Sequence, residues 1–276
     1  MRNNRSIGRT FERRTPQAKT KLSRMDHLFT PHGEAALAAV MRRDPLLAFD
    51  FDGTLAPIVD RPDDASVPDD VSRCLAKLAR AHPVAIITGR LIADVRARLG
   101  FEPHFVIGNH GAEDERSRMP ASAAQALDDL RHRIGAAGRA LADAGVVVED
   151  KRYSLAFHYR LAADAAVAFA AIGALLGELA PSLGRFGGKY VVNVVASGMP
   201  DKGEALTRLV HRSRAGAAFF VGDDINDEAV FRRAVPPWLT VRIGRDDPTS
   251  QAMYFLDDVT ELIPVLRRME DLASPT

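Results

Sequence analysis

Two aspartates separated by one residue, Asp50 and Asp52, are the side chains in this sequence best suited to chemistry. They belong to the segment Asp50-Phe51-Asp52-Gly53-Thr54, which follows an apolar run. On an extended chain, side chains two positions apart project the same way, so the carboxylates repel unless a hard cation or a proton relieves them. Gly53 permits a tight turn and a close backbone approach to an anion. Taken alone, Asp-Gly after a strand is also a common turn, and the segment leaves both interpretations open.

Three further polar clusters supply the partners that such carboxylates need. Gly222-Asp223-Asp224-Ile225-Asn226-Asp227 adds acids, Thr88-Gly89-Arg90 adds a hydroxyl and a cation, and Lys202-Gly203 adds another cation. Carboxylates suit a hard divalent cation, whereas hydroxyl and cationic donors suit the oxygens of a phosphate. Together the clusters predict a metal site beside a phosphate site, which is what phosphoryl transfer requires.

Short apolar runs precede three of these clusters and predict buried parallel strands. The runs are Leu46-Leu47-Ala48-Phe49, Val84-Ala85-Ile86-Ile87 and Ala218-Phe219-Phe220-Val221. Continuous apolarity is typical of a strand that is covered on both faces. Helical spacing lies between the runs, in Val71, Leu75 and Leu78 after Pro68 and in Ile92, Val95 and Leu99 after Arg90. This alternation predicts a doubly wound parallel α/β sheet, in which ligands bind at the carboxyl ends of the strands.

The pattern changes between Asp114 and Met199, where a second unit is predicted. It contains an Ala-rich helical stretch at 121–144, an apolar stretch at 146–148, an alternating strand at 154–160, a helix around Ala165 and a strand at 189–195. We expect a core domain at 26–113 and 199–276, with a smaller α/β domain inserted at 114–198.

Composition is that of an ordinary globular protein, with 46% hydrophobic residues, 26% charged residues and a formal net charge of +1. Such a balance gives no indication of nucleic-acid or membrane binding. The longest apolar run, 165–177, is too short to cross a bilayer. The single cysteine, Cys74, lies among helix-spaced apolar residues and is assigned to the core, so no intrachain disulfide is possible and a cytoplasmic location is expected. Nothing in the sequence indicates an obligate protein partner.

Basic residues are concentrated in residues 1–25, which hold eight Lys and Arg against one acid, Glu12. The stretch has no apolar periodicity and no secretory signal, and we expect a disordered basic tail. Three other interpretations stay open: a nucleic-acid-binding arm, a transit peptide, or a true start of translation at Met25.

The order Asp-x-Asp-Gly-Thr, Thr, Lys and Gly-Asp-Asp-x-x-Asp resembles the haloacid dehalogenase superfamily from about Leu46 onward. The resemblance implies a Rossmann-like core with a cap domain, and catalysis through an aspartyl-phosphate. By this resemblance Asp50 is the nucleophile and Asp52 the general acid and base, while Thr88 and Lys202 hold the phosphoryl oxygens. An acid at position 52 also distinguishes phosphatases from the superfamily's ion pumps, which resemble this motif but carry Thr there.

The same resemblance implies a magnesium site. Asp50, Asp223 and the backbone carbonyl of Asp52 are the implied ligands of Mg²⁺. Asp224 and Asp227 are expected to support these ligands without contacting the ion.

Three more stretches resemble trehalose-6-phosphate phosphatases: Gly108-Asn109-His110-Gly111-Ala112-Glu113, Glu149-Asp150-Lys151 with Ser154 and His158-Tyr159-Arg160, and Gly222-Asp223-Asp224 continuing to Asp227-Glu228. The resemblance implies that the cap binds a sugar phosphate and that trehalose 6-phosphate is the substrate. The implied substrate-binding residues are His110, Glu149, Lys151, Arg160 and Asn193. Asn193 departs from the pattern, because relatives usually carry Glu there, and an amide is not a charged acceptor. His158 is assigned to a packing role.

Other activities fit the same motifs. They are hydrolysis of another sugar phosphate of the sucrose or mannosylglycerate type, phosphohexomutase activity, and non-catalytic sensing of a sugar phosphate. A sensor has no need of a nucleophile, so the set of Asp50, Asp52, Lys202 and Asp223 favours an enzyme.

Overall fold

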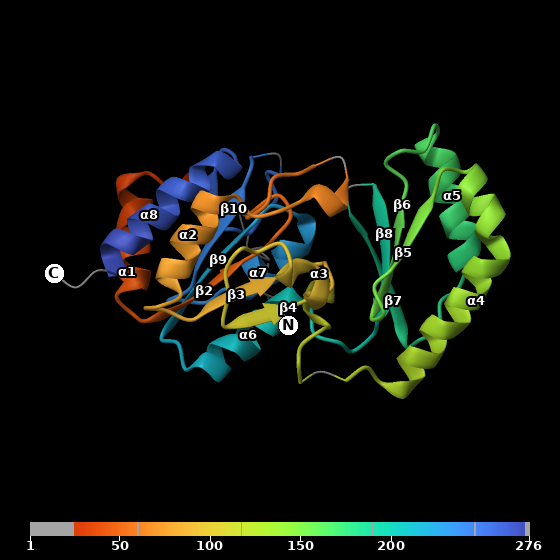
Figure 1. Ribbon diagram of the computed structural model, residues 1–276, viewed down its shortest axis with the longest axis horizontal. Helices are drawn as coiled ribbons and strands as arrows, with labels where there is room; N and C mark the ends of the chain where they lie inside the picture. The colour runs from red at the N-terminus through yellow and green to blue at the C-terminus, as the bar shows by residue number, and fades with distance from the viewer. Residues whose placement is uncertain (1–24, 60, 117, 189, 246, 274–276) are drawn as a thin grey trace, which may run out of the picture.

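The computed structural model describes residues 25–59, 61–116, 118–188, 190–245 and 247–273. They form two β-sheets, a larger parallel one and a smaller antiparallel one, which lie side by side with the chain crossing between them (Figure 1). The basic tail expected at 1–25 lies outside the described residues except for Met25. No helix in the described ranges is long and apolar enough to cross a membrane.

The larger sheet has seven strands in the order β1-β11-β10-β9-β2-β3-β4, and all of its neighbouring strands are parallel. Its strands are β1 (Asp26–His27), β2 (Pro45–Phe49), β3 (Val84–Ile87), β4 (Phe105–Ile107), β9 (Ala217–Gly222), β10 (Leu239–Ile243) and β11 (Tyr254–Leu256). The three strands expected from apolar runs are therefore present as β2, β3 and β9, next to one another in the sheet.

Helices cover both faces of this sheet, as its continuous apolar strands require. Leu47 and Phe49 of β2 pack in one hydrophobic cluster, and Leu46 and Ala48 pack in the other. The first cluster includes α1 (Pro31–Met41), α2 (Asp69–Leu78) and α8 (Leu262–Ala273), and the second includes α6 (Lys202–Ser213) and α7 (Glu228–Arg233). The predicted doubly wound α/β architecture is confirmed.

Local sequence explains where several of these helices begin. Thr30 accepts a hydrogen bond from Gly33 N at the start of α1, and Asp201 accepts one from Glu204 N at the start of α6. Such caps satisfy backbone N–H groups that have no partner inside the helix. The helix expected after Arg90 is shorter than its apolar spacing indicates, because α3 (Ile92–Arg96) ends before Leu99, which is nevertheless buried.

The smaller sheet has the strand order β5-β6-β8-β7 and is antiparallel throughout. It is built from β5 (Val147–Asp150), β6 (Ser154–His158), β7 (Leu183–Gly188) and β8 (Val191–Ala196), and α4 (Ala121–Asp143) and α5 (Ala165–Leu176) cover one of its faces. Leu155, Phe157 and Val194 point to these helices and form a separate hydrophobic cluster. The opposite face, which includes Ala156 and Asn193, lies toward the larger sheet (Figure 1). We call this unit the cap.

The chain leaves and re-enters the core at one place. It leaves after β4 through the 3-10 turn η2 (Asn109–Gly111) and returns just before α6. Gly111 has φ +113, and a Cβ built on it would lie 2.5 Å from the carbonyl carbon of Asp201 and 2.7 Å from the carbonyl oxygen of Pro200. The outgoing and returning segments therefore touch, and only glycine fits between them.

Candidate active site

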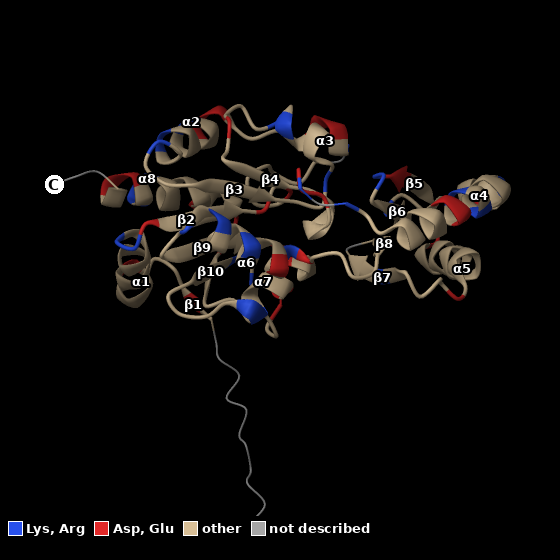
Figure 2. Cartoon of the chain, turned by 90° about the horizontal axis from the view of Figure 1, so that it is seen from below, with Lys and Arg blue, Asp and Glu red and all other residues tan. Residues whose placement is uncertain are grey.

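The polar clusters lie at the carboxyl ends of β2, β3 and β9. Asp50 follows β2, Thr88 follows β3, and Asp223 follows β9. Because these strands are adjacent and parallel, their ends meet at one edge of the sheet. Charged segments gather at this edge, between the core and the cap (Figure 2). The predicted convergence of the clusters is present in the fold.

Lys202 is the centre of the charged group at this edge. Its Nζ lies 2.9 Å from Asp50 Oδ1 and 2.8 Å from Asp227 Oδ1. All three side chains are almost completely buried. Lys202 is the first residue of α6. Asp201 is the N-cap residue of that helix, and its hydrogen bond to the first turn therefore also fixes the position of the lysine. Buried charges are tolerated only when paired in this way.

Burial raises the pKa of Asp50 well above its ordinary value; Lys202 opposes the rise, and Asp227 and Asp223 add to it. Burial also raises the pKa of Asp223 to about 7, and the charge of Asp227 contributes to the shift. Burial lowers the pKa of Lys202, but Asp227 and Asp50 more than reverse this and raise it. One lysine therefore does not neutralise this set of acids, and a further cation is favoured here.

The residues present fit a hard divalent cation. Asp50, Asp223 and Asp227 each offer a carboxylate oxygen, and these atoms lie within 4.8 Å of one another. Asp223 Oδ1 is buried and has no hydrogen-bond partner in the described part of the chain. Gly53, at φ +75, leaves space for this carboxylate, since a Cβ there would lie 2.1 Å from Asp223 Oδ2. An oxygen-only donor set with an unpaired buried oxygen is suited to Mg²⁺.

The two acids expected to support the metal ligands differ in position. Asp227 is fully buried, and it accepts from Lys202 Nζ through Oδ1 and from Asp224 N, 3.0 Å away, through Oδ2. Asp224 accepts from Ile225 N and from Asn226 Nδ2 at the start of the 3-10 turn η3 (Ile225–Asp227). Both oxygens of Asp227 thus already accept a hydrogen bond within the site, which makes the unpaired oxygen of Asp223 the more available metal ligand. Asp224 accepts hydrogen bonds at the start of a turn beside it.

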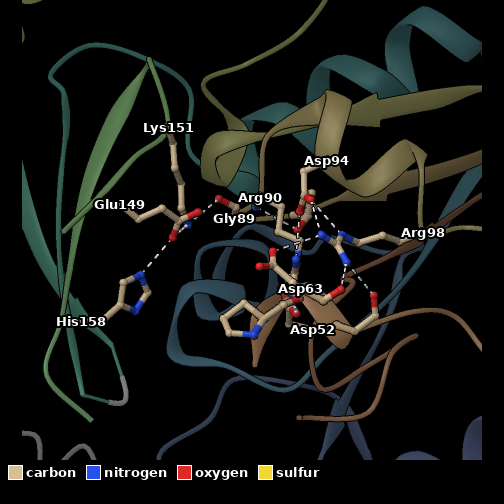
Figure 3. A network of polar contacts seen from close by, with 12 residues as sticks. Asp52, Asp63, Gly89, Arg90, Asp94, Arg98, Glu149, Lys151 and His158 are labelled. Carbon is tan, nitrogen blue, oxygen red and sulfur yellow. Dashed lines mark hydrogen bonds and ion pairs between the residues drawn. The ribbon is translucent and has the colours of Figure 1, made fainter. Parts of the chain in front are cut away.

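Asp52 is held by Arg90 rather than pointing at the acid cluster. Arg90 donates from Nε to both carboxylate oxygens of Asp52, at 3.1 and 2.9 Å, and from Nη2 to Oδ1 at 2.7 Å. The guanidinium also donates to Asp94 (Figure 3) and to the Pro62 carbonyl. The hydroxyl of Thr88 accepts from Arg90 N at 3.1 Å, which leaves its hydrogen available to a phosphate oxygen. Arg90, the cation of the Thr88-Gly89-Arg90 cluster, therefore binds the carboxylate of Asp52.

A second polar group lies on the cap, opposite the Thr88 loop (Figure 3). Glu149 on β5 is 2.9 Å from His158 Nε2 and 3.4 Å from Lys151 Nζ. Lys151 also donates to the Gly89 carbonyl of the core at 3.2 Å. Burial raises the pKa of Glu149, but the His158 hydrogen bond and the Lys151 charge outweigh it, and the pKa is lowered. Glu149 is therefore an anionic acceptor beside the core.

Asn193 and His110 also lie between the cap and the core. Asn193 is buried on β8, directly opposite Phe186 of β7, and the Phe186 ring meets the ring of His110 edge-on at a centroid distance of 5.2 Å. Burial lowers the pKa of His110 well below its ordinary value, and the charges of Lys202 and Lys151 lower it further. His110 is thus kept neutral, and its Nδ1 has no partner among the described residues.

Arg160 does not join this group. Strand β6 ends at His158, two residues before the end that alternation predicts, and Arg160 lies exposed in the following turn. Among the residues described, Arg160 makes no hydrogen bond or ion pair. Its role in substrate binding stays a prediction without a contact to support it.

The sequence does not predict the contacts that His158 and Arg90 make in the site. His158 was assigned to packing, yet it contacts Glu149, and the alternation of β5 and β6 places both side chains on the core-facing side. Arg90 was grouped with the phosphate donors, yet it holds Asp52. Strand parity could have indicated the first pairing, but no local pattern indicates the second.

Sequence relatives were found over most of the chain. The trehalose-phosphatase family matches residues 48–259. A trehalose-phosphate phosphatase of Mycobacterium tuberculosis is 33% identical over 223 residues, covering 77% of this chain and 57% of the relative. That of Mycolicibacterium paratuberculosis is 33% identical over 253 residues, with coverages of 83% and 63%. The chain thus spans less than two thirds of these curated relatives.

Solved structures share the fold. The C-terminal domain of Candida albicans trehalose-6-phosphate phosphatase superposes with a TM-score of 0.70 at 22% identity, covering 90% of this chain and 98% of that one. A haloacid dehalogenase-like hydrolase from Bacteroides thetaiotaomicron gives 0.58 at 14% identity, with coverages of 82% and 99%. These likenesses confirm the expected Rossmann-like core with a cap. With a family match over most of its length, the chain belongs to the trehalose-phosphatase family.

Proposed function

We propose that this protein hydrolyses trehalose 6-phosphate to trehalose and inorganic phosphate, with Mg²⁺ and through a phosphorylated Asp50. The observation that carries the proposal is the buried Asp50–Lys202–Asp227 arrangement beside the unpaired oxygen of Asp223. A carboxylate approaches an anionic phosphate only where positive charge offsets the repulsion. The family membership of the chain and the names of its relatives support the sugar.

Mg²⁺ would be held by Asp50, Asp223 and the backbone carbonyl of Asp52, and when bound it supplies charge that stabilises the phosphoryl oxygens. Lys202 contributes a fixed positive charge 2.9 Å from Asp50 Oδ1. Thr88 offers its hydroxyl hydrogen to the same phosphoryl group. Asp227 keeps Lys202 in place, because its Oδ1 accepts from the lysine Nζ.

In the first step, an oxygen of Asp50 forms a bond to phosphorus while the bond from phosphorus to the sugar oxygen breaks. The leaving oxygen takes a proton from the carboxyl group of Asp52, so trehalose departs as a neutral alcohol. In the second step, the Asp52 carboxylate takes a proton from water, and this water attacks phosphorus. Inorganic phosphate leaves, Asp50 is regenerated, and Asp52 is again protonated.

Before the first step Asp52 must leave Arg90 and take up a proton from solvent, because both of its oxygens accept from the guanidinium in the pair. It gives a proton back to solvent when it returns to Arg90 after the second step. The separation is feasible because Arg90 keeps Asp94 and the Pro62 carbonyl as partners and also lies 5.1 Å from the centre of the Phe51 ring. We propose that the Arg90 pair is the resting position of Asp52.

Sugar recognition is assigned to the cap side. Glu149 offers a charged acceptor to sugar hydroxyls, Lys151 a charged donor, and Asn193 both a donor and an acceptor. His110 offers one ring nitrogen without a partner. Glu149, Lys151 and Asn193 face the phosphoryl site from the cap, and His110 lies on the core side of the same interface, where a sugar joined to the transferring phosphate would lie.

A phosphate-release assay tests this function. Purified protein is incubated with trehalose 6-phosphate, sucrose 6-phosphate, mannosylglycerate phosphate and p-nitrophenyl phosphate, each with Mg²⁺ or with EDTA. We expect phosphate release to be fastest from trehalose 6-phosphate, to need no bisphosphate activator, and to be lost in EDTA. Faster release from another sugar phosphate would show that trehalose 6-phosphate is not the preferred substrate, and phosphate transfer that depends on a bisphosphate would indicate a mutase.

A cytoplasmic location stays a prediction from the single cysteine, to be tested by fractionation.

A further inference from the structure

A buried hydrogen-bonded junction joins the cap to the core beside the phosphoryl site. Ser154, the first residue of β6, donates its hydroxyl to Asn109 Oδ1 at 2.6 Å, and Asn109 Nδ2 donates to the Lys151 carbonyl at 3.2 Å. Asn109 and Ser154 are each 1% exposed. Buried polar bonds of this kind are costly to break, because each partner is left without water.

The core fixes Asn109 from its other side. Asn109 N donates to the Arg90 carbonyl at 2.9 Å, and Asn109 Nδ2 donates to Glu113 Oε2 at 2.8 Å. Glu113 Oε2 also accepts from Ile92 N, at the start of α3. The backbone of Asn109 has φ +49, a conformation that asparagine adopts more readily than most residues. Both ends of its side-chain amide are thus used: Oδ1 bonds the cap, and Nδ2 bonds both the cap and the core.

The junction acts on the turn that carries Lys151. Lys151 N donates to the Ser154 carbonyl at 2.9 Å, which closes the turn between β5 and β6. The Lys151 side chain then reaches the Gly89 carbonyl at 3.2 Å, next to Thr88. Two bonds to Asn109 therefore hold the base of the turn, while the ammonium group lies at the phosphoryl loop.

We propose that Asn109 and Ser154 are positioning residues that hold Lys151 at the Thr88-Gly89-Arg90 loop, so that its ammonium group is in place before a sugar phosphate binds. This inference rests on the proposed function for its kinetic consequence, but the placement of Lys151 is tested without any substrate. An ammonium held in advance costs little further ordering when substrate binds, and a small ester that does not reach the cap gains nothing from it.

The main variant is Ser154→Ala, and Ser72→Ala is its matched control. Ser72 is also buried and donates its hydroxyl to the Leu99 carbonyl at 2.6 Å, but it lies within the core, in α2. The two variants therefore lose the same kind of buried bond, at the junction in one case and away from it in the other. Asn109→Asp, made together with Glu113→Gln, is a second test, because it keeps an acceptor for Ser154 and removes the donor to the Lys151 carbonyl. The Glu113→Gln change avoids two facing carboxylates, since Asn109 Nδ2 also donates to Glu113 Oε2.

We expect Ser154→Ala to lower kcat/KM for trehalose 6-phosphate by roughly tenfold, mainly through KM, and to lower that for p-nitrophenyl phosphate less than twofold. Without substrate, acetylation of Lys151 followed by mass spectrometry should become at least threefold faster, with exposed Lys77 as the internal reference. Ser72→Ala should leave the ratio of the two kcat/KM values and the acetylation rate of Lys151 at wild-type values.

Unchanged acetylation of Lys151 in Ser154→Ala and in the double variant Asn109→Asp with Glu113→Gln would overturn the inference, whatever the substrate proves to be. An equal loss of kcat/KM for trehalose 6-phosphate and p-nitrophenyl phosphate would also overturn it, since the junction would then only stabilise the fold. If wild-type protein releases no phosphate from trehalose 6-phosphate but Lys151 becomes reactive in the variants, the proposed substrate fails and the positioning role stands.

Discussion

Replacing Lys202 by Met tests whether one buried cation holds the acid cluster together. Lys202 is 3% exposed and lies within 3 Å of both Asp50 and Asp227. Removing one partner of a buried ion pair leaves an uncompensated charge, which costs about 3–5 kcal/mol. For a protein of this size each kcal/mol corresponds to roughly 2–4 °C, so the melting temperature should fall by about 6–20 °C.

The drop in melting temperature caused by Lys202→Met should depend on pH and on magnesium. Burial already raises the pKa of Asp50 well above its ordinary value, and loss of Lys202 removes the group that opposes this rise. A raised pKa stabilises the fold fully below the unfolded value and loses that effect as pH rises through the folded value. The loss in the variant is therefore largest at pH 8 in EDTA, smaller at pH 5, and partly reversed by Mg²⁺ at pH 8.

Thermal unfolding followed by circular dichroism measures these shifts, with Lys77→Met as the matched control. Lys77 Nζ lies 3.1 Å from Glu270 Oε2, but its side chain is 65% exposed, so the same substitution should cost less than about 1 kcal/mol. A Lys202→Met protein that melts within 2 °C of wild type at pH 8 in EDTA would refute the reasoning. So would a deficit that is the same at pH 5 and pH 8.

Three other outcomes follow from the site. In EDTA, wild-type protein should lose stability from pH 4 to pH 8 as Asp223, whose pKa burial raises to about 7, ionises; calorimetry should then show a larger stabilisation by Mg²⁺ at pH 8 than at pH 5, and equal effects would contradict this. Asp50→Asn should abolish turnover with the circular dichroism spectrum unchanged, whereas activity within tenfold of wild type would mean that Asp50 is not the nucleophile. Glu149→Ala should lower kcat/KM for trehalose 6-phosphate by roughly ten- to a thousandfold and Arg160→Ala by less than about threefold, and a reversed order would show that Arg160 reaches the substrate.

The parts of the fold that the sequence predicts are those that depend on local pattern. Each of β2, β3 and β9 is a short apolar run that ends in a polar cluster, and hydrophobic periodicity identifies both the strand and its end. Once three such strands are taken as parallel neighbours, their ends must converge. The position of Asp50, Thr88 and Asp223 at one edge follows from that, without knowledge of any contact.

The parts that it does not predict depend on contacts between distant segments. Strand β7 contains Gly184, Gly187 and Gly188, which have little strand propensity, and pairing with β8 gives the segment its extended form. Asp52 and Arg90 are far apart in the sequence, and either side chain has several rotamers that suit its backbone. Only the packing of the two loops decides that they pair, and no periodicity carries that information.

The contact of Gly111 with Pro200 and Asp201 has a consequence for how the protein can change over evolutionary time. Because the outgoing and returning segments touch at Gly111, the residues between them form an inserted loop whose length adds little to the entropy cost of closing the core. A different cap could be inserted at the Gly111 contact without displacing Asp50 or Lys202. The core segments that carry Asp50 and Lys202 can thus be kept while the cap varies, and Gly111 is the residue that any such exchange must retain.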